Sequence, residues 1–496
     1  MSNTLVVDKE FCQPAFEEWQ NIFELNMRAK GAFNRNYSGL RTEILKKSRV
    51  FTDKLNQISM QLFSRKISID FICDIEKGIA ASAHQPEISH AGIIYKQNML
   101  DRFCRENKIC GLNVIIDTDQ GNSGSLILPG KKGNLPDKQK YDLDRDIEPL
   151  LFKVVPARSE LKKILQKILA DLAESELAYL NPKIERFLEF YSALSGQPIS
   201  IAHTIVRRIY QRSPAFLEIP FSEILQIEEA ARFFHDIMKN HQVFVPLYNN
   251  LLHNYRLLHK TKNPLNPFPD LNIAGDFVEL PFWAIDKNNR TRESLFVTTV
   301  EKGAQFKVGT SVMAFEVLNS KYITAPKASL ITAFLRLVLS DLFVHGKGGA
   351  KYDRFTDLLI LEYFKATPPI YVTASADSYI FKQEVKAYEK DKAEIEYRRN
   401  LNFHIDKFLD SINWKAGHKE RLSKLAAEKK ELIDKITEHK ESKISTAALT
   451  QEIKKIENHI RDIIKENIGK QKEFKQVSKA YLDAIYSRDF SYFLFD

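Results

Sequence analysis

The 496-residue sequence lacks long apolar runs and closely spaced cysteines. No stretch reaches the roughly 18 uncharged apolar residues that a membrane-spanning helix needs, so we expect no membrane partner. Residues 1–10 have no basic region followed by an apolar run, which argues against a signal peptide. The four cysteines, Cys12, Cys73, Cys104 and Cys110, include no C-x-x-C pair. This pattern predicts reduced thiols, no metal site and a cytoplasmic protein.

The basic residues also form no cluster. The chain has 73 Lys and Arg against 64 Asp and Glu, a net charge of +9, and the two signs are interleaved along its length. Proteins that bind nucleic acids gather basic residues on one face or segment, because affinity comes from neutralising consecutive phosphates. We therefore do not expect nucleic acid as a partner. The small positive surplus favours small anionic ligands.

The spacing of apolar residues predicts an α/β core. Residues 1–77 have mainly helical spacing. Residues 78–83 are small and uncharged, as in a buried strand, and 93–107 return to helical spacing. Residues 110–116 form the near-continuous apolar run typical of parallel sheets. Strand, helix and strand in this order form a βαβ unit with a right-handed crossover.

Further strands are expected after a long helical stretch. Residues 120–150 are rich in turn-forming residues and predict a loop, whereas 157–255 have helical spacing. The later expected elements are strands at 278–285, 294–298, 342–344 and 370–373 and helices that begin at 330 and 351.

From about residue 381 the chain becomes rich in charged residues, with apolar residues at heptad spacing. The repeat includes Leu422, Leu425, Leu432, Ile436, Ile453, Ile456, Ile460 and Ile463. It predicts two antiparallel helices of about 25 residues in a coiled-coil hairpin. The hairpin is either only structural or the contact of a homodimer. The aromatic residues in 481–495 predict that this closing segment packs back on the core.

Three polar loops fall where predicted strands end, and ligands of parallel sheets collect at such ends. The first loop holds His84, Gln85 and His90 before a helix. Two imidazoles and an amide can act as catalytic contacts to a substrate, and the alternative is that the histidines only cap the helix. Residues 90–93 are similar to the H-x-G-H signature of nucleotidylyl transferases, with Ile93 in place of the last histidine.

The second loop places Asp117 and Asp119 directly after the apolar strand at 110–116. Carboxylates at a strand end can bind a ribose hydroxyl, an amine or hydrated Mg²⁺. An ordinary Asp-rich turn is the alternative.

The third loop consists of His345, Gly346, Lys347, Gly348 and Gly349. Its glycines let the backbone curve around an anion, and Lys347 with Lys351 adds positive charge. The spacing is not that of a Walker loop. We interpret the loop as a phosphate or carboxylate site, with a structural turn as the alternative. Asp353 on the following helix could orient a ligand or favour the N-terminal end of the helix.

The first loop resembles that of the bacillithiol synthase family, which carries a G-Q-Q-P/A loop leading to an L-Y-x-x-Y-K helix. The matching residues are Gln85, Pro86, Tyr95 and Lys96. Ala83 and His84 stand where that family has Gly and the first Gln.

The third loop and the strand after it carry a second resemblance. F-V-H-G-K-G-G-A-K-Y-D and P-P-I-Y-V are similar to the family's Y-V-G-G-P-G-E-I-A-Y and P-x-P-I-L-V segments. Gly346, Gly349 and Tyr352 fall near equivalent positions, whereas the family's glutamate after the glycines is absent. Some uncharacterised bacterial proteins look closer still, because they share the H-Q-P-E, D-x-D and H-G-x-G-G-A-K-Y-D patterns.

The resemblance implies a Rossmann-type, nucleotidyltransferase-like parallel sheet with helical insertions and a C-terminal antiparallel coiled coil. It also implies a ligase or transferase acting on a small-molecule substrate, with Lys96 and Tyr352 among the residues that bind substrate or nucleotide. ATP, ADP or another nucleotide, with Mg²⁺, is the candidate cofactor class. Because both loops depart from the family's pattern, we expect an acceptor other than that family's glucosaminyl malate. A non-catalytic binding or scaffold protein that acts through its coiled coil is the alternative.

The chain is thus expected to have six parts. They are an N-terminal helical segment (1–77), a first Rossmann-type half (78–156), a helical insertion (157–260), a second part of the α/β core with the glycine-rich loop (261–380), the coiled-coil hairpin (381–478) and a C-terminal segment that packs on the core (479–496).

Overall fold

The computed structural model divides into two compact units. Unit 1 comprises Met1–Tyr379 and Ser487–Asp496, and unit 2 comprises Ile380–Tyr486. The residues described are 6–69, 75–121, 124–133, 135–144, 146–173, 175–300, 303–441, 445–469 and 477–496. Within these ranges we find no helix with the length and apolar character needed to cross a bilayer.

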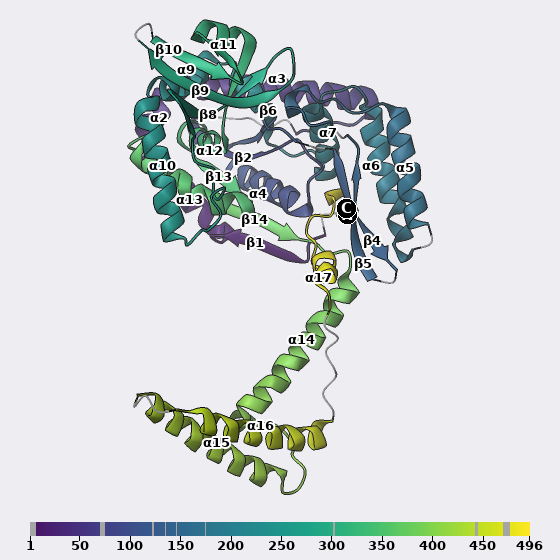
Figure 1. Cartoon of the computed structure of the whole chain (residues 1–496). Helices are drawn as coiled ribbons and strands as arrows, with labels where there is room; N and C mark the ends of the chain where they lie inside the picture. Colours follow the sequence, from purple (N-terminus) through teal and green to yellow (C-terminus); the bar gives the residue numbers. More distant parts are fainter. Residues whose placement is uncertain are drawn as a thin grey trace. The chain divides into compact units, whose positions relative to one another are not determined.

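Unit 1 contains a six-stranded, mostly parallel sheet. Its strands, in spatial order, are β1 (Lys9–Gln13), β14 (Val372–Asp377), β13 (Leu342–His345), β2 (Ile79–His84), β3 (Cys110–Ile115) and β6 (Leu217–Pro220). The pairs from β14 to β6 are parallel, whereas β1 runs antiparallel to β14 (Figure 1). The expected mixed α/β class with a parallel sheet is confirmed.

Two smaller β structures accompany this sheet. One is an antiparallel sheet in the order β11-β10-β9-β8-β12, with β7 beside β8. Its strands are β7 (Ile273–Ala274), β8 (Phe277–Asp286), β9 (Arg292–Val300), β10 (Gly303–Val308), β11 (Ser311–Met313) and β12 (Tyr322–Pro326). The other is a hairpin of β4 (Ser125–Lys132) and β5 (Leu135–Asp142).

Helices cover both faces of the parallel sheet. The helices described in unit 1, not all of which contact this sheet, are α1 (Trp19–Ala29), α2 (Gly31–Asn36), α3 (Ser38–Phe63), α4 (Ala91–Asn107), α5 (Arg158–Leu172), α6 (Asn181–Ala193), α7 (Ile199–Gln211), α8 (Phe221–Ile224), α9 (Glu228–Lys239), α10 (His241–Leu258), α11 (Phe315–Lys321), α12 (Ala328–Phe334) and α13 (Lys347–Glu362). Side chains alternate along a strand, so Ala80 packs with α1 and α4 while Ile79 and Ala81 join the cluster with α3, α10, α12 and α13. Burial on both faces explains the uncharged strand sequences.

Three predictions for unit 1 were wrong. The N-terminal segment is not only helical, because β1 forms an edge strand that pairs with β14 far along the chain. Residues 120–150 contain the β4–β5 hairpin, where prolines are tolerated because neither strand is central in a sheet. The expected helical insertion contains β6, whose four residues are too few to show a strand period.

Unit 2 is helical, with α14 (Lys382–Phe403), α15 (His418–Glu441), α16 (Ala447–Ile468) and α17 (Lys479–Ile485). Figure 1 shows α15 and α16 side by side. The two expected helices are present as α15 and α16, and a third helix that was not predicted, α14, adds Leu401 to the small core around Leu422 and Ile460. Only Leu401 is buried on α14, so this helix has no apolar stripe that the sequence could reveal.

Of the closing aromatic residues, those in 487–495 lie in unit 1, whereas Tyr481 and Tyr486 belong to unit 2. Phe490 and Phe493 are fully buried, and the Phe493 ring stacks on Phe187 with 4.1 Å between ring centroids. Of the cysteines, Cys12 and Cys104 are free thiols, whereas Cys110 is disulfide-bonded, which corrects the expectation of reduced thiols at that position. Cys73 lies outside the described residues.

Candidate functional site

A cavity of about 770 Å³ lies at the carboxyl edge of the parallel sheet. Residues after β2, β3 and β13 line it, together with parts of β14, β8, β9, α10, α12 and the closing segment. The strands β3, β2 and β13 are parallel neighbours, so the loops after them leave the sheet at the same edge. The structure therefore brings the three polar loops of the sequence together at one cavity.

The two histidines of the first loop are uncharged at neutral pH. Burial, with Lys96 as a positive neighbour, lowers the pKa of His84 to about 3. Burial, with Arg488 nearby, lowers the pKa of His90 to about 4. His90 also caps α4, because its Nδ1 accepts a hydrogen bond from the Gly92 N–H at 3.0 Å. Both imidazoles can exchange hydrogen bonds with a ligand, but neither supplies positive charge.

The two aspartates of the second loop have different environments. Asp119 lines the cavity, where its carboxylate lies 2.8 Å from an Arg292 guanidinium nitrogen and accepts a hydrogen bond from Gln85 Nε2 at 3.1 Å. Asp117 is buried outside the lining and accepts hydrogen bonds from the Ser222 backbone N–H (2.9 Å) and hydroxyl (2.5 Å). Burial raises the pKa of Asp117 to about 6. We therefore correct the expected ligand contact from Asp117, because its carboxylate holds the start of α8.

The glycine-rich loop forms the N-terminus of α13. Gly346 is the N-cap, and Lys347, Gly348 and Gly349 begin the helix without a capping side chain among the described residues. Their backbone N–H groups have no intrahelical acceptor, and such groups attract anions. A Cβ on Gly349 would lie 2.9 Å from His345 Nδ1, whereas a Cβ on Gly348 would meet open space.

His345 is held by buried ionic groups behind this loop. Its Nε2 lies 2.8 Å from Asp353 Oδ2, and Arg336 donates to the same oxygen at 2.6 Å. Although burial opposes it, these two neighbours lower the pKa of Asp353 below its usual value. Asp353 lies outside the cavity lining and positions His345. Lys351 is exposed and also outside the lining, whereas Tyr352 contributes to it.

Lys96 lies in the cavity wall with only 2% of its surface exposed. Its Nζ donates a hydrogen bond to the Ala83 carbonyl oxygen at 2.9 Å. No carboxylate of the described residues pairs with it. Burial, together with the positive charge of Arg207, lowers the pKa of Lys96 to about 7.

Several cavity residues were not predicted from the sequence. The Arg292 guanidinium and the Lys327 ammonium each lie 4.4 Å from the ring centroid of Trp283. Arg488 of the closing segment donates a hydrogen bond to the Ser375 hydroxyl at 2.7 Å. These side chains come from elements far apart in the chain, and no local pattern marks them.

The cavity has basic and apolar parts. The charged side chains that line it are Lys96, Arg292, Lys327, Lys347, Arg488, Asp119 and Asp489, and the apolar and aromatic ones include Tyr248, Phe268, Leu271, Trp283, Ile331, Leu335 and Phe343. This lining suits an anion with an apolar or aromatic part. No group of three metal-ligating side chains was found in the described ranges. A magnesium ion bound mainly by ligand phosphates would have Asp119 as a candidate carboxylate.

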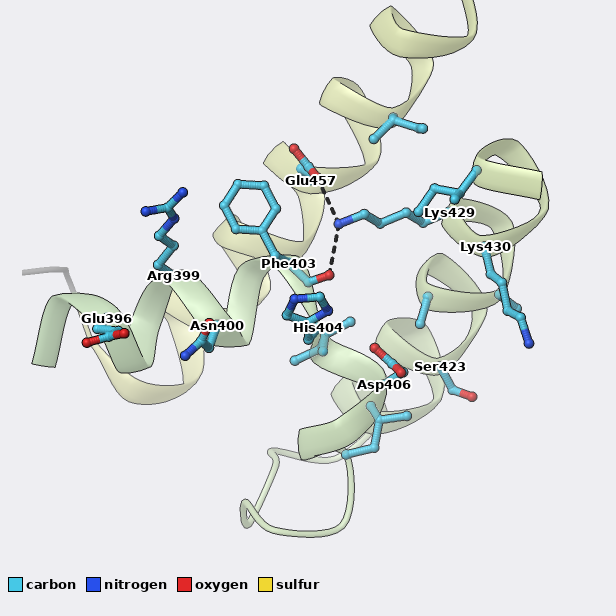
Figure 2. Close-up of a pocket in the computed structure, with 16 residues that line it drawn as sticks. Glu396, Arg399, Asn400, Phe403, His404, Asp406, Ser423, Lys429, Lys430 and Glu457 are labelled. Carbon is cyan, nitrogen blue, oxygen red and sulfur yellow. Dashed lines mark hydrogen bonds and ion pairs between the residues drawn. The ribbon is translucent and has the colours of Figure 1, made fainter. Parts of the chain in front are cut away.

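A second pocket, of about 870 Å³, lies in unit 2 (Figure 2). In it, Lys429 Nζ lies 2.8 Å from Glu457 and donates to the Phe403 carbonyl oxygen at 3.1 Å. Lys429 and Glu457 neutralise each other, and none of the predicted site residues lies in this pocket. We assign it no chemistry.

Comparison with known proteins adds no assignment. Neither a scan against models of protein families nor a search of curated proteins finds a match to this chain.

Proposed function

We propose that unit 1 is a small-molecule ligase or transferase that binds a nucleotide or another phosphorylated metabolite. The observation that carries this proposal is that three polar loops line one cavity with a basic surplus. The strand order supports a Rossmann-type core, since β2 has β3 and β6 on one side and β13 and β14 on the other. In sheets of this order, ligands bind where the order reverses, which here is between β2 and β13.

The lining suggests how such a ligand would lie. Its phosphate would meet the free N–H groups at the start of α13, next to Lys347. Its apolar or aromatic part would contact the wall that includes Phe268 and Phe343. His84 and His90 would contact the reacting group as neutral hydrogen-bonding groups, and Gln85 would assist them.

Calorimetry with ATP, ADP, CTP, sugar phosphates and inorganic phosphate tests this proposal. Gly348→Asp adds a carboxylate where the structure has open space, so it should weaken anion binding without disturbing the fold. Gly348→Asn is the matched neutral control and should retain binding. If no phosphate compound binds, or if Gly348→Asp and Gly348→Asn bind equally, the proposed site is wrong. His84→Ala should lower turnover once a substrate is known.

A relationship to the bacillithiol synthase family is part of this proposal, and it rests on the sequence motifs alone. A cytoplasmic location is also part of this proposal. The disulfide at Cys110 argues against it, because disulfides are rare in the cytoplasm.

The alternative function is a scaffold that acts through unit 2, with a coiled-coil contact between two copies. It is favoured by exposed apolar side chains in the unit 2 pocket, where Phe403 is 45% and Ile433 is 46% exposed. Ile433→Glu should then convert a dimer to a monomer in light scattering, whereas Lys435→Glu, on the same helix, should not. A wild-type monomer would exclude this contact.

A further inference from the structure

Lys96 differs from every other lysine that lines the cavity. Lys327 pairs with Glu279 at 2.5 Å, and Lys347 lies 3.3 Å from an Asp377 oxygen. Lys96 has only the Ala83 carbonyl oxygen as a polar partner among the described residues, at 2.9 Å. A carbonyl accepts a hydrogen bond from an amine as well as from an ammonium, so this contact does not require a charge.

The surroundings of Lys96 disfavour its protonated form. The side chain is 2% exposed, so water solvates an ammonium poorly there. The neighbouring titratable groups are Arg207 of α7, which is positive, and the uncharged imidazoles of His84 and His90. With a pKa of about 7, a large fraction of Lys96 is the free amine at neutral pH, whereas an exposed lysine is almost entirely protonated. The free amine is the nucleophilic form.

We propose that Lys96 forms an imine with a small aldehyde or keto compound that carries a phosphate or carboxylate group. The inference rests on the proposed function in one respect, because it uses the same cavity and the same anion site at α13. The nitrogen lone pair adds to the carbonyl carbon to give a carbinolamine. Loss of water then leaves the C=N bond, and the water carries away the carbonyl oxygen and both N–H hydrogens. The step needs no oxidant, and His84 and His90 line the cavity as neutral hydrogen-bonding groups.

The anionic group of the substrate follows from the rest of the lining. The cations that line the cavity are Arg292, Lys327, Lys347 and Arg488, and the carboxylates that line it are Asp119 and Asp489. Glu279 and Asp377, outside the lining, pair with three of these cations, so the free N–H groups at the start of α13 supply the remaining attraction for an anion. These basic groups are held in place by carboxylate or hydroxyl partners, so they can attract an anion while Lys96 reacts. The substrate class is therefore an oxo compound with a phosphate or a carboxylate, and the carbonyl carbon must reach Lys96 Nζ.

The test uses the full-length protein with pyridoxal 5′-phosphate, a phosphorylated aldehyde, and sodium cyanoborohydride to reduce any imine. Peptide mass mapping should find Lys96 as the site that is modified first. Inorganic phosphate should slow the modification by competing at α13. The rate at Lys96 should level off just above pH 7, whereas the rate at exposed lysines should keep rising toward their pKa near 10.5.

Two variants complete the test. Lys96→Arg keeps a basic side chain but cannot form the imine, so the rapid modification should disappear. Lys351→Arg, on an exposed side chain outside the cavity, should leave it unchanged. If Lys96→Arg does not fold, the peptide map and pH profile of the wild-type protein still decide the question. Modification spread over exposed lysines, with Lys96 unmodified, would overturn the inference.

The outcomes also separate this inference from the proposed function. Rapid modification of Lys96 in a protein that binds no nucleotide or sugar phosphate would support the amine chemistry and refute the nucleotide site. Nucleotide binding by a protein whose Lys96 is unreactive would support the nucleotide site and refute the amine chemistry.

Discussion

Replacing Lys96 by Met should stabilise unit 1, and the gain should shrink as the pH rises. In the unfolded chain a lysine has a pKa of 10.5, whereas in the folded protein the pKa of Lys96 is about 7. At about 1.4 kcal/mol per pKa unit, this fall in the pKa of Lys96 lowers the stability of the folded protein by about 5 kcal/mol at a pH where the lysine is protonated in both states. Because internal water and relaxation reduce such penalties, about 5 kcal/mol is an upper value. Met fills similar space and carries no charge.

The sign of the pH dependence follows from proton binding. Below pH 7 both states of the wild type are protonated and the penalty is complete. Between pH 7 and 10.5 the unfolded chain binds more protons than the folded protein, so wild-type stability rises with pH. From pH 6 to 9 the wild type should gain about 2–3 kcal/mol relative to Lys96→Met. Loss of the hydrogen bond to Ala83 costs the variant about 1–2 kcal/mol at every pH and does not change this slope.

Urea unfolding at pH 6, 7, 8 and 9, followed by tryptophan fluorescence, measures the difference. Trp19 and Trp283 lie in unit 1 and report on its unfolding. Groups that do not interact with Lys96 titrate equally in both proteins and cancel in the comparison. Lys351→Met is the matched control, and its difference from the wild type should be independent of pH. A constant difference between wild type and Lys96→Met across this range would refute a lowered pKa at Lys96.

Four further substitutions have expected outcomes that urea unfolding measures. Glu218→Ala should lower the free energy of unfolding by about 3–5 kcal/mol, because two arginines of α7 remain buried without the carboxylate that they share. A variant as stable as the wild type would show that water takes the place of the carboxylate. Gly349→Ala should cost about 1–3 kcal/mol through its clash with the ring of His345. A Cβ on Gly348 would meet open space, so Gly348→Ala should leave the stability unchanged or raise it by up to about 1 kcal/mol. Similar effects at both glycines would contradict the described packing. Phe493→Ala should cost about 3–5 kcal/mol because the buried ring stacks on Phe187, and a loss below about 1 kcal/mol would place the closing segment elsewhere.

The site loops could be located from the sequence because each follows a strand with a strong local signal. The uncharged run before His84 and the apolar run before Asp119 both identify central strands, and Gly346–Gly349 stand out after a third. Parallel strands end at one edge, so residues selected one strand at a time lie near one another once the strands are neighbours.

The errors have a common origin in long-range pairing. The strand β6 has four residues and is specified by its pairing with β3, about a hundred positions earlier, rather than by its own periodicity. Asp117 and Asp119 look equivalent in the sequence, yet they lie in a turn after β3, and the turn directs Asp117 toward Ser222 and Asp119 toward the cavity. Likewise, Lys351 follows the glycines closely, but it lies on the exposed side of α13.

Local composition and periodicity were sufficient for the α/β class, for most helices and for the three loops, because these depend on neighbours within a few residues. Only the tertiary structure decided that Lys96 has no counter-ion among the described residues, and that Arg292 and Lys327 both lie against the Trp283 ring. It also decided that the closing segment supplies Arg488 to the cavity. Burial and charge pairing depend on which distant elements surround a side chain. The reactivity of a lysine is therefore set by the fold, and the sequence alone does not reveal it.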